Sequence, residues 1–426
     1  MLEAVRVALD PTPMQEAMLF SHAGAARFAF NAALAYVREM LEKGEAAGWS
    51  LYELRKWWNA HKDTLAPWWR QNSKEAYNTG LESLSRALSN WAASRKGKRK
   101  GPRMGFPKFR SKDKATPRFA YTTGSFGLIP GDAKALRLPR IGRVHCMEDV
   151  AARVGDGRAL RMTIARTGGR WFASLTVERP DPTSTTPPTG GDVGVDLGVK
   201  SLATLSDGTV VPNPRTLDNN ERRLAKAQRA LSHKQKGSKR RRRARERVAR
   251  LHAHVANQRR DVIGKMTTWL ASTFTRIGIE DLGVKGMAKN HRLAKAIMDA
   301  SFGEVRRQLT YKCARTGAML RVIDRWFPSS KTCSSCGRVK AKLPLNERTY
   351  RCEQCGLVMD RDLNAAINIK VAGSAPETLN ARGAGIRPAT PRGGGQSAVK
   401  REPSGHDNGI RLGADGRKDV LQARTN

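Results

Sequence analysis

Acidic residues are scarce in this sequence, and long hydrophobic runs are missing from it. The 426 residues contain 38 Asp and Glu against 78 Lys and Arg, a formal net charge of +40. A chain this basic repels itself unless a polyanion compensates the charge, which favours a nucleic acid over an anionic membrane surface as the partner. No run of about 18 apolar residues is present, and the first residues show no signal-peptide pattern. The sequence therefore predicts no transmembrane helix and no membrane partner.

Cysteine is also rare, and its placement is informative. Four of the six cysteines form two Cys-x-x-Cys pairs separated by 15 residues: Cys333, Cys336, Cys352 and Cys355. This spacing is typical of a structural zinc site, where four thiolates fill the coordination shell and leave no position for catalysis. Cysteine used in this way indicates a reducing compartment rather than a disulfide framework. Cys146 and Cys313 stand alone, and we expect Cys313, on an apolar helix face, to be a core residue.

The first 180 residues predict a β-rich region and a group of helices. Residues 1–10 read as a strand, and residues 118–180 read as short strands separated by Gly-rich turns. Residues 11–117 predict three helices and then a basic segment containing Gly and Phe, which includes Lys108 and Arg110 and suits the tracking of phosphates. Paired tryptophans in the second helical block favour core packing over base stacking, which needs exposed rings beside cations.

The pattern changes after a linker at residues 181–191. Three short strands, a helical stretch, a strand, a helix, a strand and a final helix follow, which is the element order of an RNase H-like fold. We therefore predict a multidomain α/β protein. Its nuclease-type domain covers residues 192–332, a zinc ribbon is inserted at 333–357, the last helix follows at 358–372, and a disordered tail occupies 373–426.

Three acidic residues stand out in this second half. Asp196 and Glu280 each end a buried-type strand, where an uncompensated charge is costly, and Asp362 begins the last helix. Taken singly, the first two read equally well as strand-end carboxylates facing solvent, and Asp362 reads as a helix cap. Together they could converge, because the first and fourth strands are neighbours in an RNase H-like sheet. Converging carboxylates repel one another unless hard divalent cations such as Mg²⁺ or Mn²⁺ lie among them. A pair of such ions supports phosphodiester hydrolysis.

A strongly basic run lies between these acidic segments. Lys234–Arg250 contains ten Lys or Arg residues and one acid, Glu246, with Arg240, Arg241, Arg242 and Arg243 consecutive. A solvated helix face is the simpler interpretation. Like charges four residues apart disfavour an isolated helix, and a bound phosphate backbone would remove that penalty. We therefore expect the run to bind nucleic-acid backbone, with a slight preference for RNA.

Together, these segments resemble TnpB, the compact RNA-guided nuclease of bacterial insertion sequences and relative of type V CRISPR effectors. The resemblance covers roughly residues 1–380. Its three acidic RuvC-type motifs and the ribbon entry form a specific set, whereas each motif alone is weak. The runs that carry the resemblance are Gly194–Lys200, Ile279–Leu282, Asp360–Asn368, Phe327–Gly337, Gly105–Arg110 and Asn257–Asp261.

The resemblance implies an enzyme with defined partners. A TnpB-like protein binds a guide RNA from the transposon end and cuts double-stranded DNA beside a short target-adjacent motif, using one Mg²⁺-dependent RuvC site. It implies Asp196, Glu280 and Asp362 as the catalytic acids, with Asp360 beside them in a supporting role. A guide-directed regulator that no longer cuts and a strand-transfer transposase are the alternatives.

The resemblance also assigns roles to the first half of the chain and a location to the protein. Residues 1–10 and 118–180 would form a wedge domain, and residues 11–117 a recognition lobe. Within that lobe we expect the helix at 74–95 to read the motif through Lys74, Tyr77 and Asn78. The protein would be cytoplasmic, bacterial, associated with the nucleoid, and monomeric in its complex with RNA.

Overall fold

Two main hydrophobic cores divide the chain near residue 180. The computed structural model describes residues 2–180, 186–344 and 346–374. One core joins the strands and helices of the first half, and the other lies between a second sheet and its helices. A small third cluster surrounds the cysteine pairs. Within the described ranges, no helix is both long and apolar enough to cross a bilayer.

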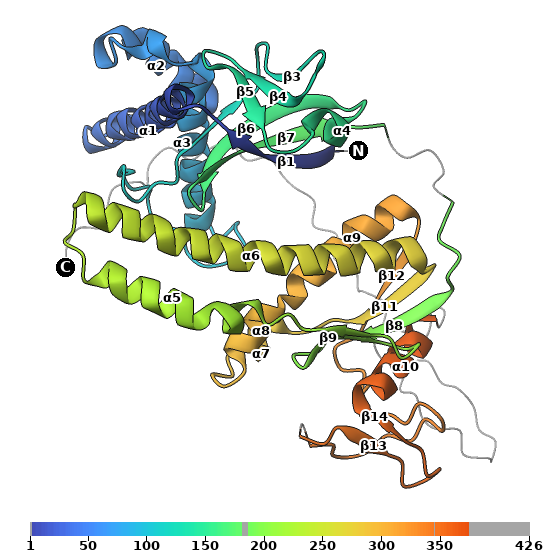
Figure 1. Cartoon of the computed structure of the whole chain (residues 1–426). Helices are drawn as coiled ribbons and strands as arrows, with labels where there is room; N and C mark the ends of the chain where they lie inside the picture. The colour runs from blue at the N-terminus through green and yellow to red at the C-terminus, as the bar shows by residue number, and fades with distance from the viewer. Residues whose placement is uncertain (1, 181–185, 345, 375–426) are drawn as a thin grey trace, which may run out of the picture.

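Three helices pack against the first sheet (Figure 1). They are α1 (Pro13–Glu42), α2 (Leu51–Leu65) and α3 (Lys74–Arg95). The helix α1 begins with a reciprocal capping box formed by Thr12 and Gln15. Trp58 is buried between these helices, as expected for a core residue, whereas Trp68 keeps more than a third of its surface exposed.

The first sheet has seven strands in the order β2-β6-β7-β1-β5-β4-β3. The amino-terminal strand β1 lies inside this sheet and pairs antiparallel with β7 and β5. The other six strands all lie between residues 118 and 178. The predicted strand at residues 1–10 and the predicted short strands of residues 118–180 are present, whereas the sequence patterns did not indicate β3 or the short helix α4. The elements are β1 (Leu2–Asp10), β2 (Arg118–Tyr121), β3 (Gly127–Ile129), β4 (Asp132–Leu138), β5 (Gly142–Cys146), α4 (Val150–Val154), β6 (Arg158–Thr167) and β7 (Arg170–Glu178).

The second sheet has five strands in the order β10-β9-β8-β11-β12. Strands β8, β11 and β12 are parallel, and β9 and β10 are antiparallel to their neighbours. The predicted adjacency of the first and fourth strands of this region is confirmed. The elements are β8 (Asp192–Asp196), β9 (Ser201–Leu205), β10 (Val210–Pro212), α5 (Thr216–Ser232), α6 (Lys239–Thr273), β11 (Arg276–Glu280), α7 (Val284–Met287), α8 (Ala294–Ala300), α9 (Phe302–Thr316) and β12 (Met319–Ile323).

The last helix lies between this sheet and the ribbon (Figure 1). The ribbon contains β13 (Thr349–Arg351) and β14 (Val358–Asp360), and α10 (Arg361–Ser374) starts directly after it. The helix continues two residues past its predicted end at 372. Most of the predicted tail, residues 375–426, and part of the predicted linker, residues 181–185, lie outside the described residues.

Candidate active site

A pair of glycines decides how closely α10 approaches the sheet. Side chains alternate along a strand, so Val193 and Val195 face the core on one side, whereas Gly194 faces α10 on the other. On the neighbouring strand, Gly278 occupies the paired position. A Cβ at Gly194 would lie well inside 3.0 Å of the carbonyl oxygen of Ala366 and the amide nitrogen of Lys370. The helix therefore crosses β8 and β11 with its backbone against theirs.

The three predicted acids converge at this crossing. Asp196 and Glu280 each follow one of the two glycines by two residues, so their side chains lie on the face that α10 covers. Both end parallel strands, whose carboxyl ends share one edge of the sheet. Asp362 lies in the first turn of α10. Burial, followed by the charges of Glu280 and Asp362, raises the pKa of Asp196 to about 8.

Each of the other two acids, Glu280 and Asp362, has a polar or charged side chain beside its carboxylate. The Ser329 hydroxyl donates a hydrogen bond to Glu280, which partly offsets the effect of burial in raising the pKa of that carboxyl. Arg348 lies 3.9 Å from the Asp362 carboxylate. Sequence reasoning did not find Ser329. Its only signal was its position in the ribbon-entry run Phe327–Gly337.

Asp360, not Asp362, caps the last helix. Its Oδ1 accepts the backbone N–H groups of Asp362 at 2.8 Å and Leu363 at 3.1 Å. The interpretation of Asp362 as a helix cap is therefore wrong, since the residue two positions earlier already satisfies those N–H groups. The Asp362 carboxylate is left available to the site, and Asp360 orients the turn that carries it.

Two buried asparagines tie α10 to the ribbon entry. The Asn364 side chain donates to the carbonyl of Thr332 at 2.7 Å and accepts from the Ser334 N–H at 3.0 Å. Asn368, one turn later, donates to the carbonyls of Ser329 and Thr332. Sequence reasoning missed both residues, although their spacing of four places them on one helix face. They join the ribbon to the helix that presents Asp362.

The four ribbon cysteines form a candidate metal centre. Their sulfur atoms lie within 4.8 Å of one another, with Cys333–Cys355 and Cys336–Cys352 separations of 3.6 Å. Four thiolates at this spacing suit a tetrahedral zinc ion. In the part of the chain that the structure describes, this is the one group of three or more such residues that is so closely spaced. The carboxylates of Asp196, Glu280 and Asp362 are therefore further apart than the four sulfur atoms.

Cys313 is buried in the second core, as predicted, and burial raises the pKa of its thiol to about 11.

The expectation that Tyr77 reads base edges is wrong. Tyr77 is 1% exposed, and its hydroxyl donates to the carbonyl of Trp69 at 3.1 Å. Asn78 is half-buried and donates to Glu75. Of the three residues predicted on this helix, Lys74 alone is fully exposed. The sequence pattern placed Tyr77 on the polar face of the helix, but tyrosine can also be buried in a core when its hydroxyl has a hydrogen-bond partner.

The basic residues predicted to bind nucleic acid differ in how free they are. Lys108 is exposed, whereas the Arg110 guanidinium lies 3.7 Å from the centre of the Phe30 ring. Arg241 donates to the carbonyls of Leu231 and Lys234, so it closes the turn between α5 and α6. The other three of the four consecutive arginines, Arg240, Arg242 and Arg243, are exposed.

The raised pKa of Asp196 predicts how stability varies with pH. The folded protein holds a proton on this group up to about pH 8, whereas the unfolded chain releases it near pH 4. Folding stability should therefore fall as pH rises between these values. In buffer without divalent ions, we expect the melting temperature to drop by several degrees between pH 6 and pH 8.5, and Asp196→Asn to reduce this drop. If the wild type and Asp196→Asn showed the same pH dependence of the melting temperature, the raised pKa of Asp196 would be contradicted.

Family models match three separate segments of the chain. Residues 174–291 match the family OrfB_IS605, described as "Probable transposase", and residues 302–369 match the "Cas12f1-like, TNB domain". Residues 1–46 match a family described as "Helix-turn-helix domain", although here they form one strand and one 30-residue helix instead of two helices joined by a turn.

Individual relatives extend this match to full length. A Mycobacterium tuberculosis protein named "Putative RNA-guided DNA endonuclease" is 37% identical over 444 residues, covering 96% of this chain and 95% of its own. A Streptomyces pristinaespiralis protein of the same name is 37% identical over 94% of this chain and 96% of its own. The solved Cas12f1–sgRNA–target DNA complex superimposes with a TM-score of 0.47 at 12% identity, covering 87% of this chain and 98% of that one.

Proposed function

Because the chain belongs to the TnpB/IS605 OrfB family, we propose that it is an RNA-guided endonuclease that cuts double-stranded DNA beside a short motif. Two relatives that it matches over nearly their whole length are named "Putative RNA-guided DNA endonuclease". The observation that carries the proposal is the convergence of Asp196, Glu280 and Asp362 at one edge of the second sheet. The proposed reaction is hydrolysis of a phosphodiester bond.

The donor set suits divalent cations. All three groups offer carboxylate oxygens, the hard ligands that Mg²⁺ and Mn²⁺ prefer. Burial raises the pKa of Asp196 most, and the charges of Glu280 and Asp362 raise it further; bound cations would neutralise that nearby negative charge. Bound divalent ions would supply charge stabilisation and water activation for phosphodiester hydrolysis. The protein's own part is to hold Glu280 through Ser329 and to fix the turn that carries Asp362 through Asp360.

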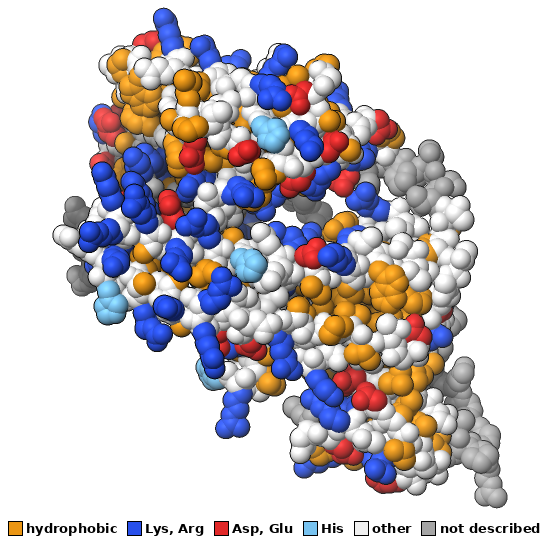
Figure 2. Space-filling model, in the orientation of Figure 1, with side chains coloured by type: hydrophobic (Ala, Val, Ile, Leu, Met, Phe, Trp, Pro, Cys, Tyr) orange, Lys and Arg blue, Asp and Glu red, His pale blue; other side chains and the backbone are white. Residues whose placement is uncertain are grey.

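The surface of the chain supports nucleic acid as its partner. Figure 2 shows Lys and Arg side chains spread over α5, α6 and the neighbouring part of the first half, with few acidic side chains among them. We propose that the guide RNA and the target DNA compensate this charge. The first sheet would act as the wedge and α1–α3 as the recognition lobe, with Lys74 and Asn78 as candidates for contact with the target-adjacent motif and Lys108 and Arg110 for contact with phosphates.

Neutralising the free part of the basic run should weaken RNA binding. Arg240, Arg242 and Arg243 changed together to Gln remove three exposed charges, while Arg241 keeps its role in the turn. We expect the slope of log affinity against log salt to become shallower by about two to three. The preferred DNA motif should not change, since phosphate contacts position a protein without reading sequence. Filter binding at several salt concentrations measures this, and an unchanged slope would leave the run a solvated helix face.

The ribbon is proposed to bind one structural zinc ion per chain. Changing both Cys352 and Cys355 to Ser should abolish zinc binding, because two thiolates cannot hold the ion in a closed shell. The ribbon should then become sensitive to protease, since a closed thiolate site contributes directly to folding. Metal analysis and limited proteolysis measure both effects. Folded, active protein without zinc would contradict the proposal.

One assay separates the proposed function from its alternatives. Purified protein is incubated with its co-purifying RNA, a plasmid carrying the matching target, and Mg²⁺. A nuclease gives linear plasmid, a regulator gives only a retarded complex, and a strand-transfer transposase gives joined products. Loss of cutting when the RNA is omitted completes the test. Binding without any linear product would reject the proposal in favour of the regulator.

A further inference from the structure

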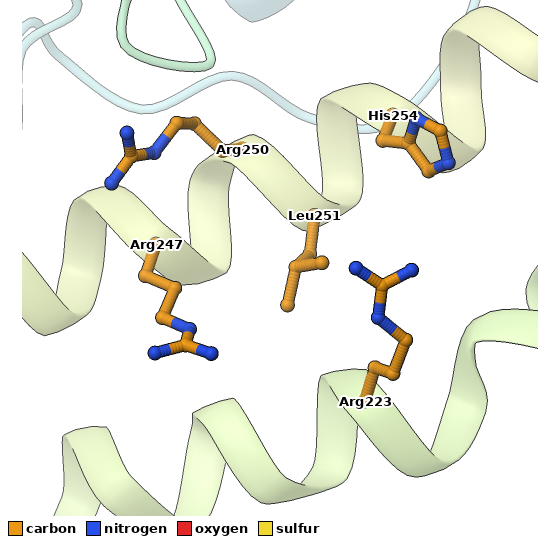
Figure 3. Close-up of a pocket in the computed structure, with 5 residues that line it drawn as sticks. All are labelled: Arg223, Arg247, Arg250, Leu251 and His254. Atoms are coloured by element: carbon orange, nitrogen blue, oxygen red, sulfur yellow. The ribbon is translucent and has the colours of Figure 1, made fainter.

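A groove between α5 and α6 gathers positive charge around an apolar floor (Figure 3). It measures about 470 Å³ and is lined by Arg223, Arg247, Arg250, Leu251 and His254. The four α6 residues follow one another at spacings of three, one and three, so they lie on neighbouring faces of two helical turns. Arg223 and Arg247 reach across from opposite helices on either side of Leu251, while Arg250 and His254 follow the other edge of α6.

The groove arginines have no protein partners within the ranges that the structure describes. Among the described residues, no hydrogen bond or ion pair involves the guanidiniums of Arg223, Arg247 or Arg250, and no acid lines the groove. Two other arginines of α6 are engaged. Arg245 bonds to the carbonyl of Asp113 and Arg241 to carbonyls of the α5–α6 turn. Guanidiniums that share a groove without a counter-ion repel one another, so an anion bound there would relieve this repulsion.

We propose that this groove binds one nucleotide of the guide RNA, with its phosphate between Arg223 and Arg247 and its sugar or base over Leu251. A planar guanidinium fork matches two phosphate oxygens, and the leucine side chain supplies the apolar surface that a sugar or base covers. RNA fits better than DNA for a functional reason. DNA must be released from the three carboxylates after cutting, whereas the guide stays bound and needs a separate hold. The inference rests on the proposed RNA-guided function.

A matched pair of variants tests the groove. Arg223→Gln removes a groove charge, and Arg222→Gln removes an exposed charge from the adjacent position on α5, outside the groove. We expect Arg223→Gln to weaken RNA binding about tenfold and to make the salt slope shallower by about one, with a smaller effect from Arg222→Gln. Leu251→Ala should weaken binding without changing the slope.

The other outcomes are each decisive. Equal effects of Arg223→Gln and Arg222→Gln would overturn the groove assignment while leaving RNA binding itself established. Weaker DNA binding by the preassembled RNA complex, with unchanged RNA affinity, would make DNA the occupant and would also overturn it. Wild-type protein that binds no RNA would instead reject the proposed function.

A second observation concerns the loop beside the carboxylates. Within the described ranges, no large apolar side chain is more exposed than Trp326, at 84%. The loop that carries it is nevertheless held on both sides. Arg325 bonds to Asp281, and Ser329 bonds to Glu280, so the neighbours of Trp326 are tied to two consecutive residues at the end of β11. The backbone N–H of Trp326 donates a hydrogen bond to the Asp324 carboxylate at 2.8 Å.

From this placement we infer that Trp326 stacks on a base of the DNA strand being cut. It lies three positions before Ser329, so its Cα is at most about 11 Å from the Cα of the residue that touches Glu280. About two nucleotides of an extended strand span that distance. Stacking on aromatic rings holds bases of any sequence, which suits an enzyme whose specificity comes from its guide. A rigid, exposed ring there would position the strand for the carboxylates. This inference also depends on the proposed function.

A substrate with missing bases tests the stacking. Trp326→Ala should slow single-turnover cutting about ten- to a hundredfold, and Trp326→Phe should restore most of it. Abasic nucleotides around the cut should slow the wild type but add little to Trp326→Ala, because both changes remove the same contact. Additive effects, or wild-type rates in Trp326→Ala, would overturn the inference. Unchanged RNA binding and zinc content show that the ribbon is intact. A wild-type protein that never cuts would reject the proposed function instead.

Discussion

Replacing any one of Asp196, Glu280 and Asp362 by Ala is expected to abolish DNA cutting while guided DNA binding persists. The three carboxylates are proposed to hold the same ions, so they act as a unit, and losing one should cost about a thousandfold or more in rate. None of them supports the core: Asp196 is destabilised by its own burial and by the charges of its two partners. Removing this buried carboxyl, whose ionised form the site disfavours, should therefore leave the fold intact or stabilise it at neutral pH.

Cleavage and binding must be measured separately for this prediction. Single-turnover cutting of a labelled target gives the rate, and a mobility-shift assay with the RNA complex gives binding. Asp207→Ala is a matched control, because Asp207 is an exposed acid in the turn between β9 and β10 of the same sheet. If Asp360→Ala abolished cutting while Asp362→Ala did not, the assignment within the last motif would be wrong.

Replacing Gly194 by Ala is expected to have an effect nearly as large without touching an acid. The added Cβ would overlap backbone atoms of Ala366 and Lys370, and backbone cannot turn aside as a side chain can. The helix α10 must then shift, and Asp362 moves with it. Overpacking of this kind costs about 1–3 kcal/mol of stability, or more where backbone is involved. Displacement of a catalytic group by about 1 Å lowers the rate about a hundredfold.

A glycine in open space provides the control. Gly303 lies in the first turn of α9 with nothing within 4 Å of its added Cβ, so Gly303→Ala should be neutral or slightly stabilising. Thermal melting and cutting rates are compared for the two variants and the wild type. Wild-type activity and melting in Gly194→Ala would show that α10 does not depend on this close approach.

The acidic and cysteine positions could be read from the sequence because their signals are local. Cys-x-x-Cys spacing and an acid at the end of an apolar strand are visible within a few residues, and the element order of the second half follows from periodicity. The strands β8 to β12 lie where these patterns predict them. The short strand β3 was missed, since three residues give too little periodicity to distinguish a strand from a turn.

The roles of individual polar residues depended on what packs against them. Tyr77 reads as a surface donor, yet it is buried because α2 and the Trp69 carbonyl lie over it. Arg241 reads like the arginines beside it, yet the carbonyls ending α5 engage it.

The sequence by itself predicted the three acids, the four thiols, the strong positive charge and the order of the elements that form the second sheet and its helices. Each depends on residue type or on spacing along the chain. Tertiary structure alone decided that Gly194 and Gly278 lie side by side beneath α10. It also placed Asn364 and Asn368 against the ribbon. These features join residues tens to more than a hundred positions apart, and such pairings form only when elements pack.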